Sequence, residues 1–133
     1  MKLLIAFGTD DGEKLKTDGH FGMSKYFYIY EFSNGKEFFM ERRENVKFQG
    51  DESMKHGDPA KARATASVLE NINVVVGKSF GPNITRLLRK YVCIVVRMDS
   101  IEESIKIIHT NIDKIIEEKN KGENRKHIVL RKL

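Results

Sequence analysis

The chain has 133 residues, of which 40% are hydrophobic and 32% are charged, and its net charge is +5 with the histidines neutral. This length predicts one domain with a single core. No apolar run approaches the roughly 18 residues of a membrane span, and the first one, at 3–7, is too short for a signal-peptide core, so we expect a cytoplasmic protein with no membrane partner. Cys93 is the only cysteine, which excludes a disulfide framework and an iron-sulfur cluster held by several thiolates.

The charge is unevenly distributed along the chain. Residues 1–118 contain 18 Lys and Arg against 18 Asp and Glu, whereas residues 119–133 contain six basic residues and one acidic residue. We therefore predict a folded domain over 1–118 and a basic C-terminal tail over 119–133. Such a tail fits an anionic partner, whether nucleic acid, an acidic protein or a charged cofactor, or serves only as a solvated terminus.

The first half of the chain predicts three strands. Residues 3–7 are apolar on both faces and precede a glycine, a pattern typical of a buried central strand that leads into a loop, here extending to residue 22. Residues 26–32 and 37–44 are rich in aromatic side chains, and Asn34-Gly35 between them favours a hairpin turn with antiparallel pairing. We expect Asp10 and Asp11, which follow the first strand, to brace the loop rather than bind magnesium.

The second half alternates helices with strands. After a polar loop at 45–57, we predict a helix over 58–70, a strand at 72–76, a helix from 84 to about 91 and a strand at 92–96. A capping box at Ser100 starts a final helix that ends near residue 118. Alternating strands and helices pair in parallel, so the prediction is an α/β domain with a mixed five-stranded sheet, an antiparallel start and flanking helices.

A group of short motifs spread over most of residues 1–118 carries a family resemblance. The motifs are Leu3-Leu4-Ile5-Ala6-Phe7, Asp10-Asp11-Gly12, His20-Phe21-Gly22, Tyr26-Phe27-Tyr28-Ile29-Tyr30, Glu41-Arg42-Arg43-Glu44-Asn45, His56-Gly57, Val74-Val75-Val76-Gly77 and Gly81-Pro82. Together they resemble the dinitrogenase iron-molybdenum cofactor biosynthesis family, small proteins and domains that carry or store the nitrogenase cofactor or its precursors. The resemblance implies a ribonuclease-H-like sheet. Tyr91, where a glycine is common, and the basic tail depart from the family pattern.

His20 is the main candidate metal ligand. Gly19 and Gly22 lie on either side of His20 and Phe21, and glycine lets a ligand approach the backbone closely. An imidazole suits transition metals of intermediate softness, although a lone histidine can instead be structural, hydrogen-bonded within its loop. His56 is a possible second ligand. Met23 either supplements His20 or packs under the loop.

Other residues are candidates for holding an anionic cofactor. Lys25 and Arg43 would supply positive charge. The turn from Gly77 to Asn83, which contains Gly81, joins a buried strand to a helix, so its amides could receive an anion, or its glycines could serve only the geometry of the turn. The spacing is not that of a P-loop. Cys93, inside an apolar strand, is interpreted as core rather than catalytic.

Taken with the family resemblance, these residues predict a non-enzymatic carrier that holds an anionic metal cluster, of the iron-sulfur or iron-molybdenum type, near the His20 loop. A cofactor-assembly protein is then a possible partner. The alternative is a nucleic-acid or protein-interaction module that works through the basic tail, and deletion of the tail would separate the two. A third hypothesis is a metal-dependent hydrolase that uses Asp10, Asp11, His20 and His56.

Overall fold

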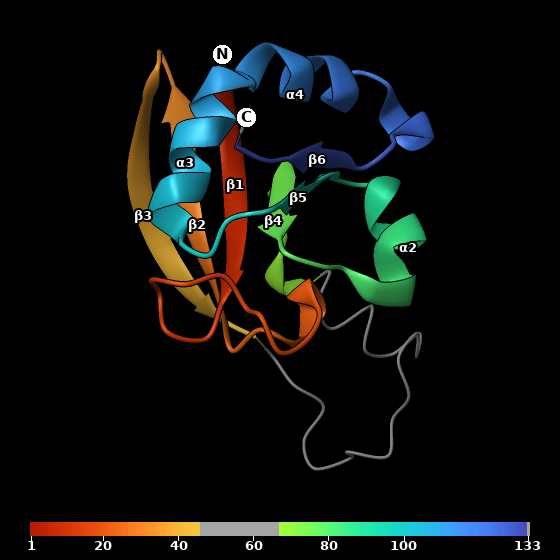
Figure 1. The fold of residues 1–133 in the computed structure, drawn as a ribbon. Coiled ribbons are helices and arrows are strands. Elements are labelled where there is room, and N and C mark those ends of the chain that lie inside the picture. The colour runs from red at the N-terminus through yellow and green to blue at the C-terminus, as the bar shows by residue number, and fades with distance from the viewer. Residues whose placement is uncertain (46–66, 133) are drawn as a thin grey trace.

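A computed structural model describes residues 1–45 and 67–132 and shows one mixed sheet with helices on both faces (Figure 1). The strand order is β3-β2-β1-β4-β5-β6. The strands are β1 (Lys2–Thr9), β2 (Tyr26–Ser33), β3 (Lys36–Glu44), β4 (Val74–Gly77), β5 (Val92–Val96) and β6 (Ile128–Leu130). The α-helices are α2 (Ile84–Leu88), α3 (Ile101–Thr110) and α4 (Ile112–Lys119), and short 3₁₀ turns form η1 (Phe21–Met23), η2 (Gly81–Asn83) and η3 (Gly122–Asn124).

The first three strands form the predicted antiparallel part of the sheet. β1 pairs with β2 along its whole length, and β2 pairs with β3. The hairpin closes through Asn34 and Gly35, whose φ angles of 51° and 74° are those of the two-residue turn that Asn-Gly favours. The predicted hairpin is therefore confirmed.

The other half of the sheet is parallel, as predicted, but it contains one strand more than expected. β1, β4, β5 and β6 pair in parallel, so their carboxyl ends meet at one edge. β6 lies within residues 119–133, the segment expected to be a basic tail, and Ile128 and Leu130 of this strand are buried. The Arg125 guanidinium, just before β6, donates to the carbonyls of Leu88, Arg89 and Lys119 at 3.1–3.2 Å.

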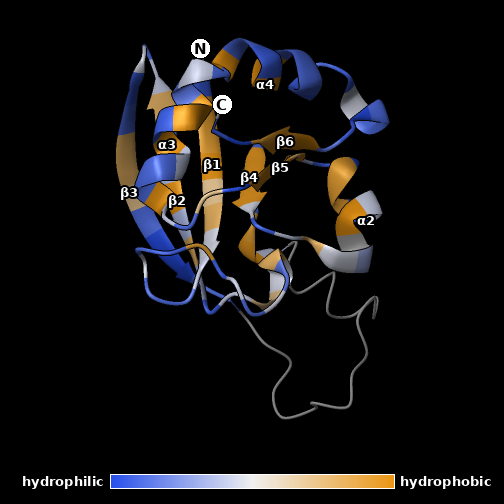
Figure 2. Ribbon diagram, viewed as in Figure 1, coloured by the Kyte–Doolittle hydropathy of each residue, from blue (hydrophilic) through white to orange (hydrophobic). Residues whose placement is uncertain are grey.

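The hydrophobic core has two layers, one on each face of the sheet. Side chains alternate along the strands, so that Val74 and Val76 face α3 and α4, whereas Val75 and Cys93 face α2 and Leu69. Figure 2 shows this distribution, with the inner strands hydrophobic and much of α3 and α4 hydrophilic. Burial raises the pKa of the Cys93 thiol to about 12, so the thiol stays protonated and belongs to the core, as predicted.

The helices differ from the expectation in length. The Ser100 side chain accepts a hydrogen bond from the Glu103 amide at 3.0 Å, which confirms the predicted cap. The long final helix is interrupted at Asn111, which divides it into α3 and α4. α2 has five residues and ends before the predicted boundary.

Two expectations fall mainly outside the described residues. These are the polar loop at 45–57, with His56, and most of the helix predicted over 58–70. Within the ranges that the structure describes, no helix has the length and apolar character needed to cross a membrane.

Candidate functional site

The loops that follow β1, β4 and β5 meet at the carboxyl edge of the parallel strands. The backbone amide of Phe21 donates to the carbonyl of Ser79 at 2.8 Å, which joins the first loop to the second. The amide of Leu15 donates to the carbonyl of Asp99, also at 2.8 Å, which joins the first loop to the third. This is the edge at which open parallel sheets bind ligands.

Phe21 anchors the first loop to the sheet. Its ring is buried, with its centre 4.9 Å from that of Phe27 and 5.1 Å from that of Phe80. A Cβ on Gly8 would lie 2.8 Å from the ring of Phe21, and one on Gly77 would lie 3.2 Å from the Phe21 side chain. Both glycines therefore leave the space that Phe21 fills. Because Phe21 is anchored in this way, the position of the preceding residue, His20, is restricted as well.

His20 lies half-buried between the first and second loops. Its Nδ1 atom is 3.1 Å from the hydroxyl oxygen of Ser79. Its ring lies over Gly81, where a Cβ would approach the ring to 2.6 Å and Nε2 to 2.9 Å. Gly81 also has a φ of +70°, a conformation that residues with a side chain rarely adopt. The contact with Ser79 and the close packing on the Gly81 backbone thus hold the imidazole.

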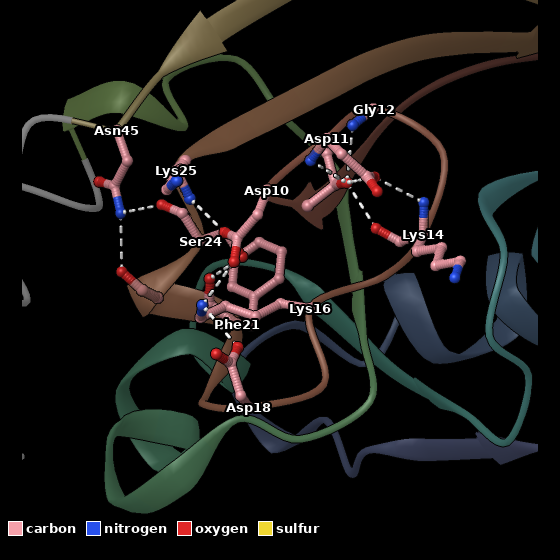
Figure 3. Close-up of polar contacts among 12 residues, drawn as sticks. Asp10, Asp11, Gly12, Lys14, Lys16, Asp18, Phe21, Ser24, Lys25 and Asn45 are labelled. Carbon is pink, nitrogen blue, oxygen red and sulfur yellow. Dashed lines mark hydrogen bonds and ion pairs between the residues drawn. The ribbon is translucent and has the colours of Figure 1, made fainter.

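A network of charged side chains also holds the loop (Figure 3). The carboxylate of Asp10 accepts hydrogen bonds from the Lys25 amide at 2.9 Å and from Lys16 Nζ at 2.7 Å. Lys16 also contacts Asp18 at 3.0 Å. Burial alone would raise the pKa of Asp10, but the hydrogen bonds from Lys16 and Lys25 outweigh it and lower the pKa. Burial would likewise lower the pKa of Lys16, and its two carboxylate partners raise it.

Asp11 shapes the turn that precedes this network. Its carboxylate accepts hydrogen bonds from the amides of Glu13 and Lys14, both at 2.9 Å. These bonds lower the pKa of Asp11. Asp10 and Asp11 therefore brace the loop, as expected.

Asn45, at the end of β3, fastens the loop to the neighbouring hairpin. Its side-chain amide donates to the carbonyls of Gly22 and Ser24, each at 2.8 Å. The buried hydroxyl of Ser24 in turn donates to the carbonyl of Phe21 at 2.7 Å. The His20 motif is consequently fixed on both sides of Phe21.

The structure brings together only part of the predicted site. His20 and Gly81 are in contact, whereas Gly77 lies under Phe21. Lys25 belongs to the same loop, and its side chain is exposed. Arg43 points elsewhere, because its guanidinium donates to the carbonyls of Val68 and Glu70 at 2.9 Å and pairs with Glu41 at 3.1 Å.

Ser79 and Asn45 are the residues of the site whose contacts the sequence did not predict. Ser79 is 59 residues away from His20 in the chain, and Asn45 is 23 residues away from Gly22. The only available signal was their position, Ser79 inside the Gly77–Gly81 turn and Asn45 at a strand end. No local pattern indicates which backbone groups they contact.

The donor groups near His20 do not form a closed metal cage. In the part of the chain that the structure describes, no group of three or more His, Cys, Asp or Glu side chains is placed to hold a metal ion.

The family model described as dinitrogenase iron-molybdenum cofactor matches residues 1–122. The chain belongs to this family. The family name connects its members with the iron-molybdenum cofactor. No curated protein sequence matches the chain significantly.

A solved structure supports the same fold. The crystal structure of a Methanocaldococcus jannaschii protein, provisionally described as a dinitrogenase, is similar to this one with a TM-score of 0.56 and 15% sequence identity. The similarity covers 84% of this chain and 91% of that chain. At this identity the likeness supports the fold and carries no information about the ligand.

Proposed function

We propose that this protein is a non-enzymatic carrier that binds an anionic metal cluster or iron-molybdenum-type cofactor at the His20 loop. The observation that supports it most is the position of His20, which is held by Ser79 and packed on Gly81 at the ligand-binding edge of the sheet. Membership of the iron-molybdenum cofactor family supports the identity of the cargo.

The Ser79 contact suggests which nitrogen binds the metal. When Nδ1–H of His20 donates to the Ser79 hydroxyl, Nε2 is the unprotonated nitrogen of the ring, the form that binds metals. Nε2 lies beside Gly81, where the absence of a side chain leaves room for the ring. In the proposed complex Nε2 of His20 is the ligand, Ser79 fixes the tautomer, and His56 is a candidate second ligand.

Positive charge near the loop would attract the cargo. Lys25 is the candidate on this loop, because its amide is fixed by Asp10 while its side chain is exposed. Arg43 donates to two carbonyls and to Glu41, so we propose that it contributes its charge at longer range. Gly81 would contribute backbone contacts beside Nε2, while Gly77 contributes the space for Phe21.

A loosely held cluster is consistent with a carrier, which must release its cargo. One or two protein ligands supported by charge allow transfer to a cofactor-assembly protein, whereas four protein ligands would retain the metal. The alternative of a free basic arm that binds nucleic acid has less support, because Lys121 pairs with Glu118, Lys132 pairs with Glu103, and β6 belongs to the sheet.

The test is purification under anaerobic conditions from a host supplied with iron and molybdenum, followed by elemental analysis. We expect near-stoichiometric metal in the wild type and its loss in His20→Ala. His127→Ala removes an exposed histidine beside β6 and serves as the matched control, in which the metal content should stay that of the wild type. Equal metal in all three proteins, or none in the wild type, would contradict the proposal.

A further inference from the structure

Met23 is one of the few large apolar side chains that are exposed in the described residues. It keeps 39% of its surface exposed, although Phe21 in the same 3₁₀ turn is buried. It therefore does not pack under the loop, which was one of its two possible roles. An exposed thioether two residues from a buried anchor needs another explanation.

The position of Met23 relates it directly to His20. The Met23 amide donates to the His20 carbonyl at 2.9 Å. His20 is the N-cap of this 3₁₀ turn and Met23 is its last residue, so only two residues separate them along the chain. The thioether is also folded back along the chain, because its Sδ atom is 3.6 Å from the point where a Cβ on Gly19 would lie. The sulfur thus lies against the residue that precedes His20.

The donor chemistry of this pair suits an anionic cargo. Imidazole and thioether are uncharged donors that favour soft or intermediate metals. A thiolate or carboxylate would add negative charge and repel an anionic cluster. Among the described residues the sulfur atoms of Cys93 and Met98 are buried and Met40 lies on β3, so Met23 is the sulfur donor that shares a loop with His20.

We propose that His20 and Met23 form a two-donor site, in which the thioether binds a soft transition metal beside the imidazole. The inference rests on the proposed role of His20 as a metal ligand. It assigns to this loop a preference for thiophilic metals over hard, oxygen-seeking cations.

Copper(I) is a suitable probe, because it is soft and its binding does not require the native cargo. Met23→Leu removes the thioether at nearly constant volume. Met40→Leu is the matched control, since Met40 is 52% exposed and lies on the edge strand β3. In anaerobic competition with a chromogenic chelator, we expect Met23→Leu and His20→Ala each to weaken copper(I) binding at least about tenfold, and Met40→Leu to bind as the wild type does.

Selenium absorption spectroscopy gives a direct second measurement. In selenomethionine-labelled wild type with one equivalent of copper(I), the selenium edge should show a selenium–copper scattering path. The path should persist in Met40→Leu and disappear in Met23→Leu. Wild-type affinity in Met23→Leu, or no selenium–copper path in the wild type, would overturn the inference.

The outcomes separate this inference from the proposed function. If iron and molybdenum loading requires His20 but Met23→Leu binds copper(I) as tightly as the wild type does, the carrier proposal stands and the two-donor site is wrong. If copper(I) needs both side chains but the protein accepts no iron or molybdenum, the two-donor site stands and the carrier proposal fails.

Discussion

The ring of His20 occupies the space that a side chain at Gly81 would need, with 2.6 Å between the ring and the position of such a Cβ. His20 follows β1 and Gly81 follows β4, so the contact locks two loops from separate parts of the chain together. The orientation of the proposed ligand therefore depends on a glycine 61 residues away in the sequence.

Gly81→Ala should displace His20 and lower metal loading. The new Cβ would collide with the ring, and the φ of +70° would strain any residue with a side chain. We expect a loss of about 1–3 kcal/mol in the free energy of unfolding, measured by urea titration, together with reduced iron and molybdenum content.

Gly122→Ala is the control for backbone strain alone. Gly122 has a φ of +64°, and a Cβ there would meet nothing within 4 Å. This variant should lose about 1 kcal/mol of stability and keep its metal content. If both variants load metal equally well, the His20–Gly81 contact has no part in binding.

Variants at Arg43 separate the effect of its positive charge on metal loading from a direct contact between its guanidinium and the cargo. Arg43→Lys keeps the positive charge but cannot make the two carbonyl contacts with Val68 and Glu70 together with the Glu41 pair. We expect a loss of about 1–2 kcal/mol in stability with unchanged metal loading, and lower loading in Arg43→Gln. Equal loss of metal in both variants would show that the guanidinium itself contacts the cargo.

Asp10 should make the stability of the protein depend on pH in the acid range. Hydrogen bonds from Lys16 and Lys25 outweigh the effect of burial and hold the pKa of Asp10 below its ordinary value of 3.8. A carboxyl group whose pKa is lower in the folded state stabilises the fold above its unfolded pKa. It loses that contribution as the pH falls through the folded pKa.

Asp10→Asn should therefore lower stability by about 1 kcal/mol near neutral pH and make the loss of stability below about pH 4 less steep. Urea titrations of both proteins between pH 2 and 7 measure this difference. Curves that run parallel over the whole range would contradict the assigned role of Asp10.

Ile128 tests whether the basic C-terminal segment is part of the fold. Its side chain is buried in β6, so Ile128→Ala should cost about 2–4 kcal/mol in the free energy of unfolding. Arg131→Ala, at an exposed position one residue beyond the strand, should change it by less than about 0.5 kcal/mol. Similar stabilities for the two variants would indicate that β6 contributes nothing.

The place of β6 in the sheet affects how a deletion of the C-terminal segment is interpreted. Removing residues 119–133 would take away β6 and the contacts of Arg125 with α2 and α4. Any loss of ligand binding in such a deletion would then report on folding. Charge-neutralising variants at exposed positions such as Arg131 are the better test of a nucleic-acid role.

The sequence predicted those parts of the fold that depend on local patterns. Asn34-Gly35 supports only a narrow set of turns, and continuous apolar runs such as Val92–Val96 suit strands buried on both faces. The capping residue Ser100 is recognisable for the same reason. In each case the information lies within a few neighbouring residues.

The parts of the fold and of the candidate site that the sequence did not predict depend on contacts between distant segments. β6 has three residues in a highly charged context, so its burial against β5 has no distinct local pattern. The role of Ser79 arises because β4 lies beside β1 and carries its following loop to His20. Arg43 was assigned to the site for its positive charge, whereas the carbonyls of Val68 and Glu70 hold its side chain.

Pulsed electron paramagnetic resonance of a cluster-loaded protein tests the central claim most directly. The protein would carry ¹⁵N-labelled histidine, and the cluster would be poised in a paramagnetic state. We predict nitrogen modulation from one histidine that changes on ¹⁵N labelling and is absent from His20→Ala loaded in the same way. Identical spectra with ¹⁴N and ¹⁵N histidine, or modulation that persists in His20→Ala, would contradict coordination by His20.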